Sequence, residues 1–345
     1  MTFSNNLHSI LPSKAKWLLC LLLLCASYTA LAEDTGSKED SNFIFHHISD
    51  AHEWHLVTVG NTHITIPLPI VLVSQSKGIE VFSSNRFWDA HHQQRVSYRG
   101  YYLNDHEKII SASPAHSFYD LSITKNVASI MLSIIVLIPI ALVALRKYRG
   151  NPFHIPRGFW ALIEMLICFV RDDIAIPNIG KHSYKRFTPY LLSIFFFIWL
   201  NNLMGLLPGA ANVTGNISVT LTLALFTLAI TFYNANKNYW RHIFCPPGIP
   251  MWLLPIMIPV EIIGVFTKPI ALMVRLFANI TAGHIILLSI ISLVFIFQTS
   301  FAGLMSVPFG AFMFMLKLLV AFLQAYIFTL LSAIYFGMAV EKAHH

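Results

Sequence analysis

The feature that most constrains this chain is the length of its charge-free apolar runs. No Asp, Glu, Lys, Arg or His occurs between Phe187 and Asn236, and Val127–Leu145 is a second such run. Because a helix needs about 20 mostly apolar residues to cross a hydrocarbon core, each run is long enough to reach across a bilayer. The whole chain is 56% apolar and 11% charged, with a mean hydropathy of +0.63. This composition excludes a cytosolic enzyme and a disordered scaffold, and it predicts an all-α polytopic membrane protein.

Residues 1–32 have the three parts of a secretory signal peptide. Two lysines precede the apolar run Trp17–Ala32, which ends in Ala-Leu-Ala, so we expect cleavage before Glu33. The alternative is a first membrane helix, for which this run is short. Cleavage would remove two of the four cysteines, and the remaining Cys168 and Cys245 lack the spacing of a metal or redox motif.

Residues 33–125 have the composition of a small extracytoplasmic domain. Thr62–Ile66 alternates polar with apolar residues, and Leu68–Val73 is apolar and partly β-branched, so we expect a mixed or β-rich fold. The segment is rich in histidine, and the following residues could supply imidazole groups: His46, His47, His52, His55, His63, His91, His92 and His106.

Two interpretations of these histidines remain open from the sequence. His52 and His55, with His47 nearby, could share a helical face and bind a divalent metal, since imidazole is a common ligand. Exposed or hydrogen-bonded histidines are the simpler interpretation, and we predict no metal site. The segment His52-Glu53-Trp54-His55 also has the wrong spacing for a zinc protease helix, whose histidines lie four apart.

The distribution of basic residues predicts the orientation of the chain in the membrane. Arg146, Lys147 and Arg149 directly follow the first long run, and the positive-inside rule places them in the cytoplasm. The N-terminal domain is then outside, in agreement with a signal peptide. Residues 157–176 mix aromatic with charged side chains and are expected to form an interfacial amphipathic helix. The basic residues lie beside apolar runs and form no stripe interleaved with aromatics, so no nucleic-acid partner is expected.

The membrane domain is expected to occupy residues 126–345. Proline, glycine and asparagine positions divide it into helices, at about 127–145, 157–176 (interfacial), 187–207, 217–233, 249–298 (broken by prolines) and 306–340. This gives about five crossings after cleavage, with the C-terminus in the cytoplasm. The absence of an internal repeat argues against an inverted-repeat transporter.

Arg275 is the most conspicuous single residue. It lies deep in an apolar run, where an arginine costs at least about 2.5–3.5 kcal/mol to insert, so it is expected to face a protein partner or water. Glu261 is fourteen positions away, beyond a proline, so we expect the partner to come from another chain. At about 100° per residue, Asn279 lies about 40° from Arg275, whereas His284 points almost opposite. The alternative, an arginine that extends to the membrane surface, fits its depth poorly.

The last apolar block carries Lys317 and Gln324, which are seven residues apart and share a helix face. Gln324 has both donors and an acceptor, so it could stabilise the guanidinium of Arg275 in an antiparallel hairpin. An ordinary hydrogen bond between helices is the alternative for Gln324 alone.

These motifs resemble subunit a of the rotary F-type ATP synthase, the stator part of its proton channel. The resemblance rests on Lys268-Pro269, on the segment Arg275–Asn279 followed by Ala282-Gly283-His284, and on Leu323–Phe328. The asparagine-containing segment Asn201–Pro208 is also similar to the family. The similarity runs from about Val127 to the end, whereas residues 33–125 exceed the short external arm usual in bacterial members.

The resemblance implies a non-catalytic channel subunit of the Fo sector, with neither cofactor nor metal. Its arginine corresponds to Arg275, facing a rotating c-ring whose carboxylates lie in mid-membrane and preventing protons from leaking between two half-channels. Asn279 and Gln324 correspond to polar residues that line this contact, and His284 to a half-channel residue that is glutamate or histidine in the family. Glu261 corresponds to a carboxylate near the channel.

A further set of expectations also comes from the resemblance. Asn216 corresponds to a polar channel-lining position, and Lys317 stands where the family usually has His or Glu, a departure that leaves the construction of the inlet open. We hypothesise a relay through His284 and Glu261, with Lys317 adjusting the local field. Implied partners are the c-ring, subunit b of the peripheral stalk, the rest of the complex and membrane lipid.

The expected location is a bacterial inner membrane, with the N-terminal domain in the periplasm. Two alternative functions remain from the sequence. One is a sodium-translocating version of the same subunit, and the other is a self-contained secondary transporter.

Overall fold

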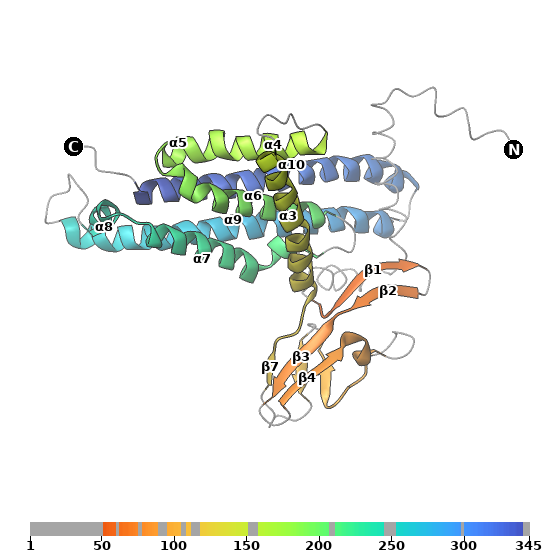
Figure 1. Ribbon diagram of the computed structural model, residues 1–345. Coiled ribbons are helices and arrows are strands. Elements are labelled where there is room, and N and C mark those ends of the chain that lie inside the picture. The colour runs from red at the N-terminus through yellow and green to blue at the C-terminus, as the bar shows by residue number, and fades with distance from the viewer. Residues whose placement is uncertain are drawn as a thin grey trace, which may run out of the picture. The chain divides into compact units, whose positions relative to one another are not determined.

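The computed structural model describes most of the chain after Asp50 (Figure 1). The described ranges are 51–59, 62–74, 78–88, 95–104, 108–111, 118–150, 158–206, 211–244, 253–297 and 300–340. The expected signal peptide lies outside them. The chain divides into two compact units, each described by itself below. The first comprises Met1–Ile123, Leu206–Ala210 and Ala282–Leu318, and the second comprises Thr124–Gly205, Ala211–Thr281 and Leu319–His345.

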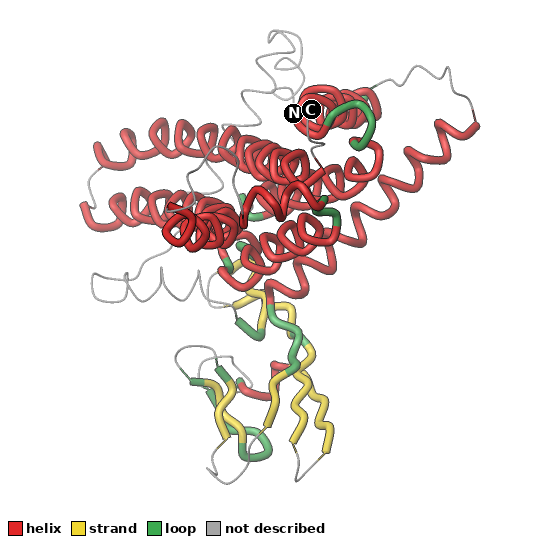
Figure 2. The backbone as a smooth tube through the Cα atoms, turned by 90° about the vertical axis from the view of Figure 1, so that its left-hand side faces the viewer, coloured by secondary structure: helices red, strands yellow, loops and turns green. Residues whose placement is uncertain are grey.

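The N-terminal part of the first unit is built from short antiparallel strands, drawn in yellow in Figure 2. β1 (Glu53–Val59) pairs with β2 (Thr62–Pro67), and β5 (Tyr101–Leu103) pairs with β6 (Ile109–Ser111). A three-stranded sheet has the order β4-β3-β7, with β3 at Pro69–Ser74, β4 at Gly78–Ser83 and β7 at Phe118–Asp120. The 3-10 turn η1 (Ser84–Phe87) follows β4. The strands confirm that a small β-containing region precedes the helices.

The core of this region follows from the alternation of side chains along β3. Ile70 and Leu72 are fully buried, whereas Val71 and Val73, which alternate with them, are only partly buried. The buried side packs against Phe87, Tyr101 and other apolar side chains from η1, β5 and β6. Successive side chains of a strand point to opposite faces, so β3 directs one face into this core and the other away from it.

His52 is one of the two histidines that the sequence suggested as metal ligands, and in the structure it is buried beside a carboxylate. Its ring Nε2 lies 3.3 Å from Asp120 Oδ2, and the residue is 5% exposed. Within the described ranges, no group of three or more His, Cys, Asp or Glu residues is placed to hold a metal ion. His47 lies outside those ranges, and for His55 only the backbone in β1 is described.

The remaining elements are helical and confirm the predicted polytopic membrane fold. They are α3 (Lys125–Gly150), α4 (Phe159–Phe169), the π-helix η2 (Val170–Ala175), α5 (Ile176–Ile179), α6 (Tyr184–Met204), the 3-10 turn η3 (Val213–Gly215), α7 (Ile217–Tyr233), α8 (Lys237–Phe244), α9 (Leu254–Phe297) and α10 (Ser300–Val340). Within the described residues, α3, α6, α9 and α10 are each long and apolar enough to cross a membrane. The count rises to five if α7 and α8, bent by 105°, form one span.

α9 differs from the expectation that prolines interrupt this block. It runs as one helix from Leu254 to Phe297 with Pro259 and Pro269 inside it. Proline removes one backbone hydrogen bond and favours a kink, but neighbouring helices allow proline to remain within a membrane helix. Glu261, Arg275, Asn279 and His284 therefore lie on one helix.

The interior of the second unit is centred on α6. Phe187, Leu191 and Phe195 of α6 are buried against residues of η2, α5, α9 and α10. The Phe187 and Phe336 rings stack with centroids 4.8 Å apart. α10 contributes Ala325 and Ala333 to this core, and small residues allow membrane helices to approach closely. This packing fixes the second half of α10 against the part of α9 that contains Arg275.

Candidate functional site

Arg275 lies on the exposed surface of α9, within a candidate membrane span. Its neighbours Leu272 and Leu276 are 2% and 1% exposed and belong to the core. At about 100° per residue, Arg275 points about 80° away from the middle of that buried stripe. Packing of the two leucines thus fixes the helix rotation that leaves the guanidinium on the surface of this chain. A charge at this depth would meet hydrocarbon unless another chain or water covers it.

The other two residues of the predicted arginine contact lie in different environments. Asn279, one turn after Arg275, is exposed on α9. Gln324 is 2% exposed and lies inside the bundle on α10, next to the buried Ala325. The structure thus brings Arg275 and Asn279 to one exposed surface and places Gln324 in the interior. Direct packing of Gln324 against Arg275 stays a prediction.

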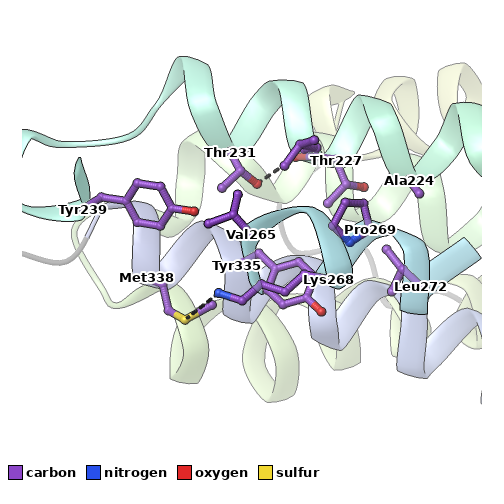
Figure 3. Close-up of a pocket in the computed structure, with 11 residues that line it drawn as sticks. Ala224, Thr227, Thr231, Tyr239, Val265, Lys268, Pro269, Leu272, Tyr335 and Met338 are labelled. Atoms are coloured by element: carbon purple, nitrogen blue, oxygen red, sulfur yellow. Dashed lines mark hydrogen bonds between the residues drawn. The ribbon is translucent and has the colours of Figure 1, made fainter. Parts of the chain in front are cut away.

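Polar residues gather around a small cavity between α7, α8, α9 and α10 (Figure 3). Lys268 Nζ lies 5.7 Å from the ring centroid of Tyr335 and 4.0 Å from Met338 Sδ. Glu261, two turns before Lys268, interacts electrostatically with Lys268 and with Tyr239 of α8. Arg275 in turn interacts electrostatically with Tyr335. Lys268 thus links α9 to Tyr335 and Met338 of α10.

The cavity itself is narrow. Its volume is about 10 Å³, room for about one water molecule. It is lined by Lys268 and Tyr335 together with threonines of α7, which Figure 3 shows on the opposite side from Lys268. Tyr239 also lines it, and the other six lining residues are apolar, so a water could bind only at the side formed by these polar groups.

A row of buried threonines on one face of α7 was not predicted from the sequence. Thr220, Thr227 and Thr231 are all buried, at 0%, 2% and 4% exposure. Thr227 Oγ1 lies 2.9 Å from the hydroxyl of Tyr190 on α6, and Thr231 Oγ1 donates to the backbone oxygen of Thr227 at 2.7 Å. With Ala224, these threonines have the spacing of four, three and four residues that marks one helix face. This spacing was the signal available in the sequence.

Two asparagines at the C-terminal end of α6 form hydrogen bonds to neighbouring helices. Asn202 Nδ2 donates to the carbonyl of Ala321 on α10 at 3.2 Å, and its Oδ1 accepts from Thr214 Oγ1 at 2.6 Å. Asn201 Nδ2 donates to Ser133 Oγ of α3 at 3.2 Å. In apolar surroundings, hydrogen bonds of this kind hold membrane helices in a specific position relative to one another. The structure therefore assigns these two asparagines a role in holding α3, α6 and α10 in register.

Asn216, expected at a channel-lining position, caps a helix. Its Oδ1 accepts from the backbone N–H of Ser218 at 2.9 Å, the arrangement of an N-cap residue at the start of α7. Asn216 is partly exposed, and a contact with a transported ion stays a prediction.

His284 and Lys317 belong to the unit that includes Ala282–Leu318. The side chain of His284 lies outside the described residues. Lys317 Cε lies 3.7 Å from the position that a Cβ at Gly283 would occupy, so α10 at Lys317 crosses α9 next to His284. The Lys317 side chain thus reaches α9 one residue before the second predicted inlet position, His284.

Two protein families match this chain. One, described as ATP synthase A chain, matches residues 127–337. The other, a domain of unknown function (DUF8433), matches residues 43–131.

Among curated relatives, the chain is 47% identical over 234 residues to ATP synthase subunit a 2 of Chlorobaculum tepidum, a match covering 65% of each protein. It is 46% identical over 233 residues to ATP synthase subunit a of Chloroherpeton thalassium, covering 66% of this chain and 69% of that protein. For ATP synthase subunit a of Myxococcus xanthus the identity is 44% over 232 residues, with coverage of 66% and 75%. The chain thus spans slightly less than two thirds of the Chlorobaculum relative. The first family match covers more than half of the chain, and the chain belongs to the ATP synthase A chain family.

Proposed function

We propose that this chain is the stator subunit of the Fo sector that conducts protons past a rotating ring of carboxylate-bearing subunits. The observation that carries this proposal is the exposed guanidinium of Arg275 inside a membrane span, fixed by the buried Leu272 and Leu276. Arginine stays protonated at any physiological pH, so its charge attracts an ionised carboxylate and repels a proton. A ring covering this surface would satisfy the charge. The chain would contribute a barrier and two aqueous paths, with no bond-making chemistry of its own.

The aqueous paths would be lined by two groups of polar residues, one in each unit of the chain. One path would include Glu261. This carboxylate interacts electrostatically with Lys268 and Tyr239, two residues that line the cavity between α7 and α10. His284 would continue this relay, and Lys317, whose side chain reaches α9 at Gly283, would adjust the local field.

Additional residues would complete the contact. Asn279 would share the exposed surface with Arg275 and line the ring contact. Gln324 would stabilise the helix pair from inside, and Asn216 would set the start of α7. The names of the relatives support this role, since each is called a subunit a of an ATP synthase.

The proposed partners and location follow from the same role. The exposed surface of α9 at Arg275 would contact the c-ring, and subunit b of the peripheral stalk would hold the chain in place. The proposed membrane is a bacterial inner membrane, with the β-containing domain in the periplasm and the C-terminus in the cytoplasm. The basic residues after Leu145 support this orientation.

Proton pumping driven by ATP in inverted membrane vesicles tests the role of Arg275. We expect Arg275→Ala and Arg275→Lys to lose pumping while the complex still assembles, because lysine lacks the planar, always-charged group. Arg186→Ala, at an exposed position near the start of α6, is the control and should pump normally. After removal of the peripheral ATPase, Arg275→Ala should also raise passive proton conductance.

Two outcomes would contradict the proposal. Unchanged pumping in Arg275→Ala would show that Arg275 is not the barrier, and the chain would then be better explained as a secondary transporter. Pumping that requires sodium would replace the proton with sodium as the transported ion.

A further inference from the structure

The short helix α8 begins where α7 ends and turns sharply away from it. α7 has 17 residues and is apolar, within the range of about 17–25 residues that crosses a hydrocarbon core. Asn234, Ala235 and Asn236 separate it from α8, and the two helices are bent by 105°. A helix that starts at the end of a span and lies nearly perpendicular to it runs along the membrane surface and not through the bilayer.

Hydrogen bonds to α10 place this corner at the end of a second span (Figure 1). The Asn236 N–H donates to Ala339 O at 2.8 Å, and Asn236 Nδ2 donates to Val340 O at 2.9 Å. Ala339 and Val340 are the last two residues of α10, where carbonyl groups have no donor within the helix. α10 is itself a candidate span up to Val340. Two spans that end side by side mark one boundary of the bilayer, and α8 starts at that boundary.

One face of α8 packs on the bundle, and a neighbouring face carries exposed aromatic rings. Ile243 is 5% exposed, and Figure 3 shows Tyr239 pointing toward the cavity that it lines. Trp240 and Phe244 are 40% and 51% exposed, and their rings stack with centroids 6.3 Å apart. The Trp240 ring also lies 5.5 Å from that of Phe232 on α7. Tryptophan concentrates at membrane–water boundaries, and phenylalanine is typical of the apolar face of interfacial helices.

Two exposed cations border this aromatic pair. Lys237 and Arg241 are four residues apart on α8, and both are exposed. At about 100° per residue, both lie within about 60° of Phe244 and roughly 140–180° from the middle of the buried face. α8 therefore presents aromatic rings and cations side by side on the surface that the bundle leaves open.

Charge complementarity identifies the partner of this surface as an anion. No Asp or Glu occurs between Asp173 and Glu261, so α6, α7 and α8 contain no carboxylate. Glu261 interacts with Tyr239, on the opposite face of α8. Anionic lipids attract Lys and Arg residues that lie next to a membrane helix. At the end of two spans the headgroup layer already surrounds α8, whereas a protein partner would have to displace it.

We propose that α8 is an interfacial anchor that binds anionic phospholipid. Trp240 and Phe244 enter the boundary between headgroups and acyl chains, and Lys237 and Arg241 bind the anionic headgroups beside them. α8 thereby sets the depth of the corner between α7 and α10, while its inner face lines the cavity through Tyr239. This inference requires only that α7 and α10 end at one membrane surface, and it does not depend on the proposed ion path.

The test uses the full chain in its assembled complex, reconstituted into vesicles of phosphatidylcholine and phosphatidylglycerol. A fluorophore is attached to Phe244→Cys, and separately to Trp240→Cys, in a background in which the native cysteines are serine. Nitroxide-labelled phosphatidylglycerol and nitroxide-labelled phosphatidylcholine, added separately in equal amounts, report which lipid lies next to the label. Iodide reports contact with water.

A pair of double variants tests the two cations. Lys237→Gln is combined with Arg241→Gln in each labelled chain. The matched control combines Lys181→Gln with Lys185→Gln, which also removes two exposed cations but near the start of α6. The control separates a local effect of α8 from an effect of the net charge.

We expect labelled phosphatidylglycerol to quench positions 240 and 244 several-fold more than labelled phosphatidylcholine. This preference should disappear in the α8 double variant and persist in the control. Quenching by iodide alone would place α8 in water and overturn the proposal. Protection from both lipid and iodide would show that a protein covers this face, and equal quenching by the two lipids would show that the cations do not select anionic headgroups; either result would overturn it as well.

Discussion

At the scale of single residues, Asp120 joins the end of β7 to the chain segment that precedes β1. Its Oδ2 lies 3.3 Å from His52 Nε2, and its Oδ1 accepts from the Ser122 N–H at 2.9 Å. Burial raises the pKa of Asp120, but hydrogen bonds from His52 and from the side chain and backbone of Ser122 outweigh burial and bring the pKa to about 2. The carboxylate is thus held ionised on an edge strand of the sheet, five residues before α3 begins at Lys125.

This depressed pKa predicts a loss of stability in acid. A carboxyl group whose pKa is lower in the folded state stabilises the fold above its unfolded pKa of about 3.9, and this contribution declines as pH falls toward 2. Because the Asp120 side chain is 35% exposed, we discount the effect to about 1 kcal/mol. Pulse proteolysis of the full chain between pH 5 and pH 2 would measure it. Asp120→Asn should be less stable at pH 5 and less dependent on pH; an identical pH profile would contradict this assignment.

The difference between what the sequence predicted and what it missed is also clear among single residues. Arg275 is visible because a guanidinium in an apolar run has a large insertion cost. The buried threonines Thr220, Thr227 and Thr231 are not, because a hydroxyl can satisfy itself against the preceding turn of its own helix. Gln324 was predicted at the arginine contact, yet its burial depends on how α10 rotates against α6, which sequence spacing alone does not determine.

At the scale of elements, Gly337 determines how closely α10 approaches α5. A Cβ at this position would collide with the backbone carbonyl of Asn178. Gly337→Ala is therefore expected to separate α10 from α5 and to cost about 1–3 kcal/mol, since a backbone carbonyl cannot rotate away as a side chain does. Gly264→Ala on α9 is the matched control, because no atom lies within 4 Å of its added Cβ. Thermal unfolding in detergent would compare them, and equal midpoints would contradict the close approach.

The contact between α6 and α10 gives a second prediction at this scale. Asn202→Leu removes the bonds to Ala321 O and Thr214 Oγ1 and leaves both groups buried, which should lower stability by about 1–3 kcal/mol. Asn236→Leu removes one exposed bond to Val340 O and should cost less than about 1 kcal/mol. The same detergent unfolding assay compares the two variants. A larger loss in Asn236→Leu would show that Asn202 does not hold the two helices in register.

The prolines show where sequence reasoning about elements fails. Pro259 and Pro269 predict breaks in isolation, yet α9 continues through both. The buried residues Val265 and Leu272 lie on either side of Pro269, so packing on neighbouring helices can outweigh the lost backbone bond. By contrast, the charge-free runs predicted the positions of α3, α6 and α7 closely, because hydrocarbon thickness sets a minimum length for a spanning helix.

At the scale of the whole molecule, the basic residues that follow α3's apolar run predict a single orientation. We expect a cysteine at Tyr102 to react with a membrane-impermeant maleimide in spheroplasts, because this part of the chain is predicted to lie outside. A cysteine at Lys181, exposed between α5 and α6, should react only after the membrane is opened. The positive-inside rule is the physical basis, since basic residues next to a span are retained in the cytoplasm.

The reverse labelling pattern would invert the proposed paths as well as the chain. A combined result in which Tyr102→Cys labels from outside while Arg275→Ala abolishes pumping would join the extramembrane domain and the arginine barrier in one oriented subunit.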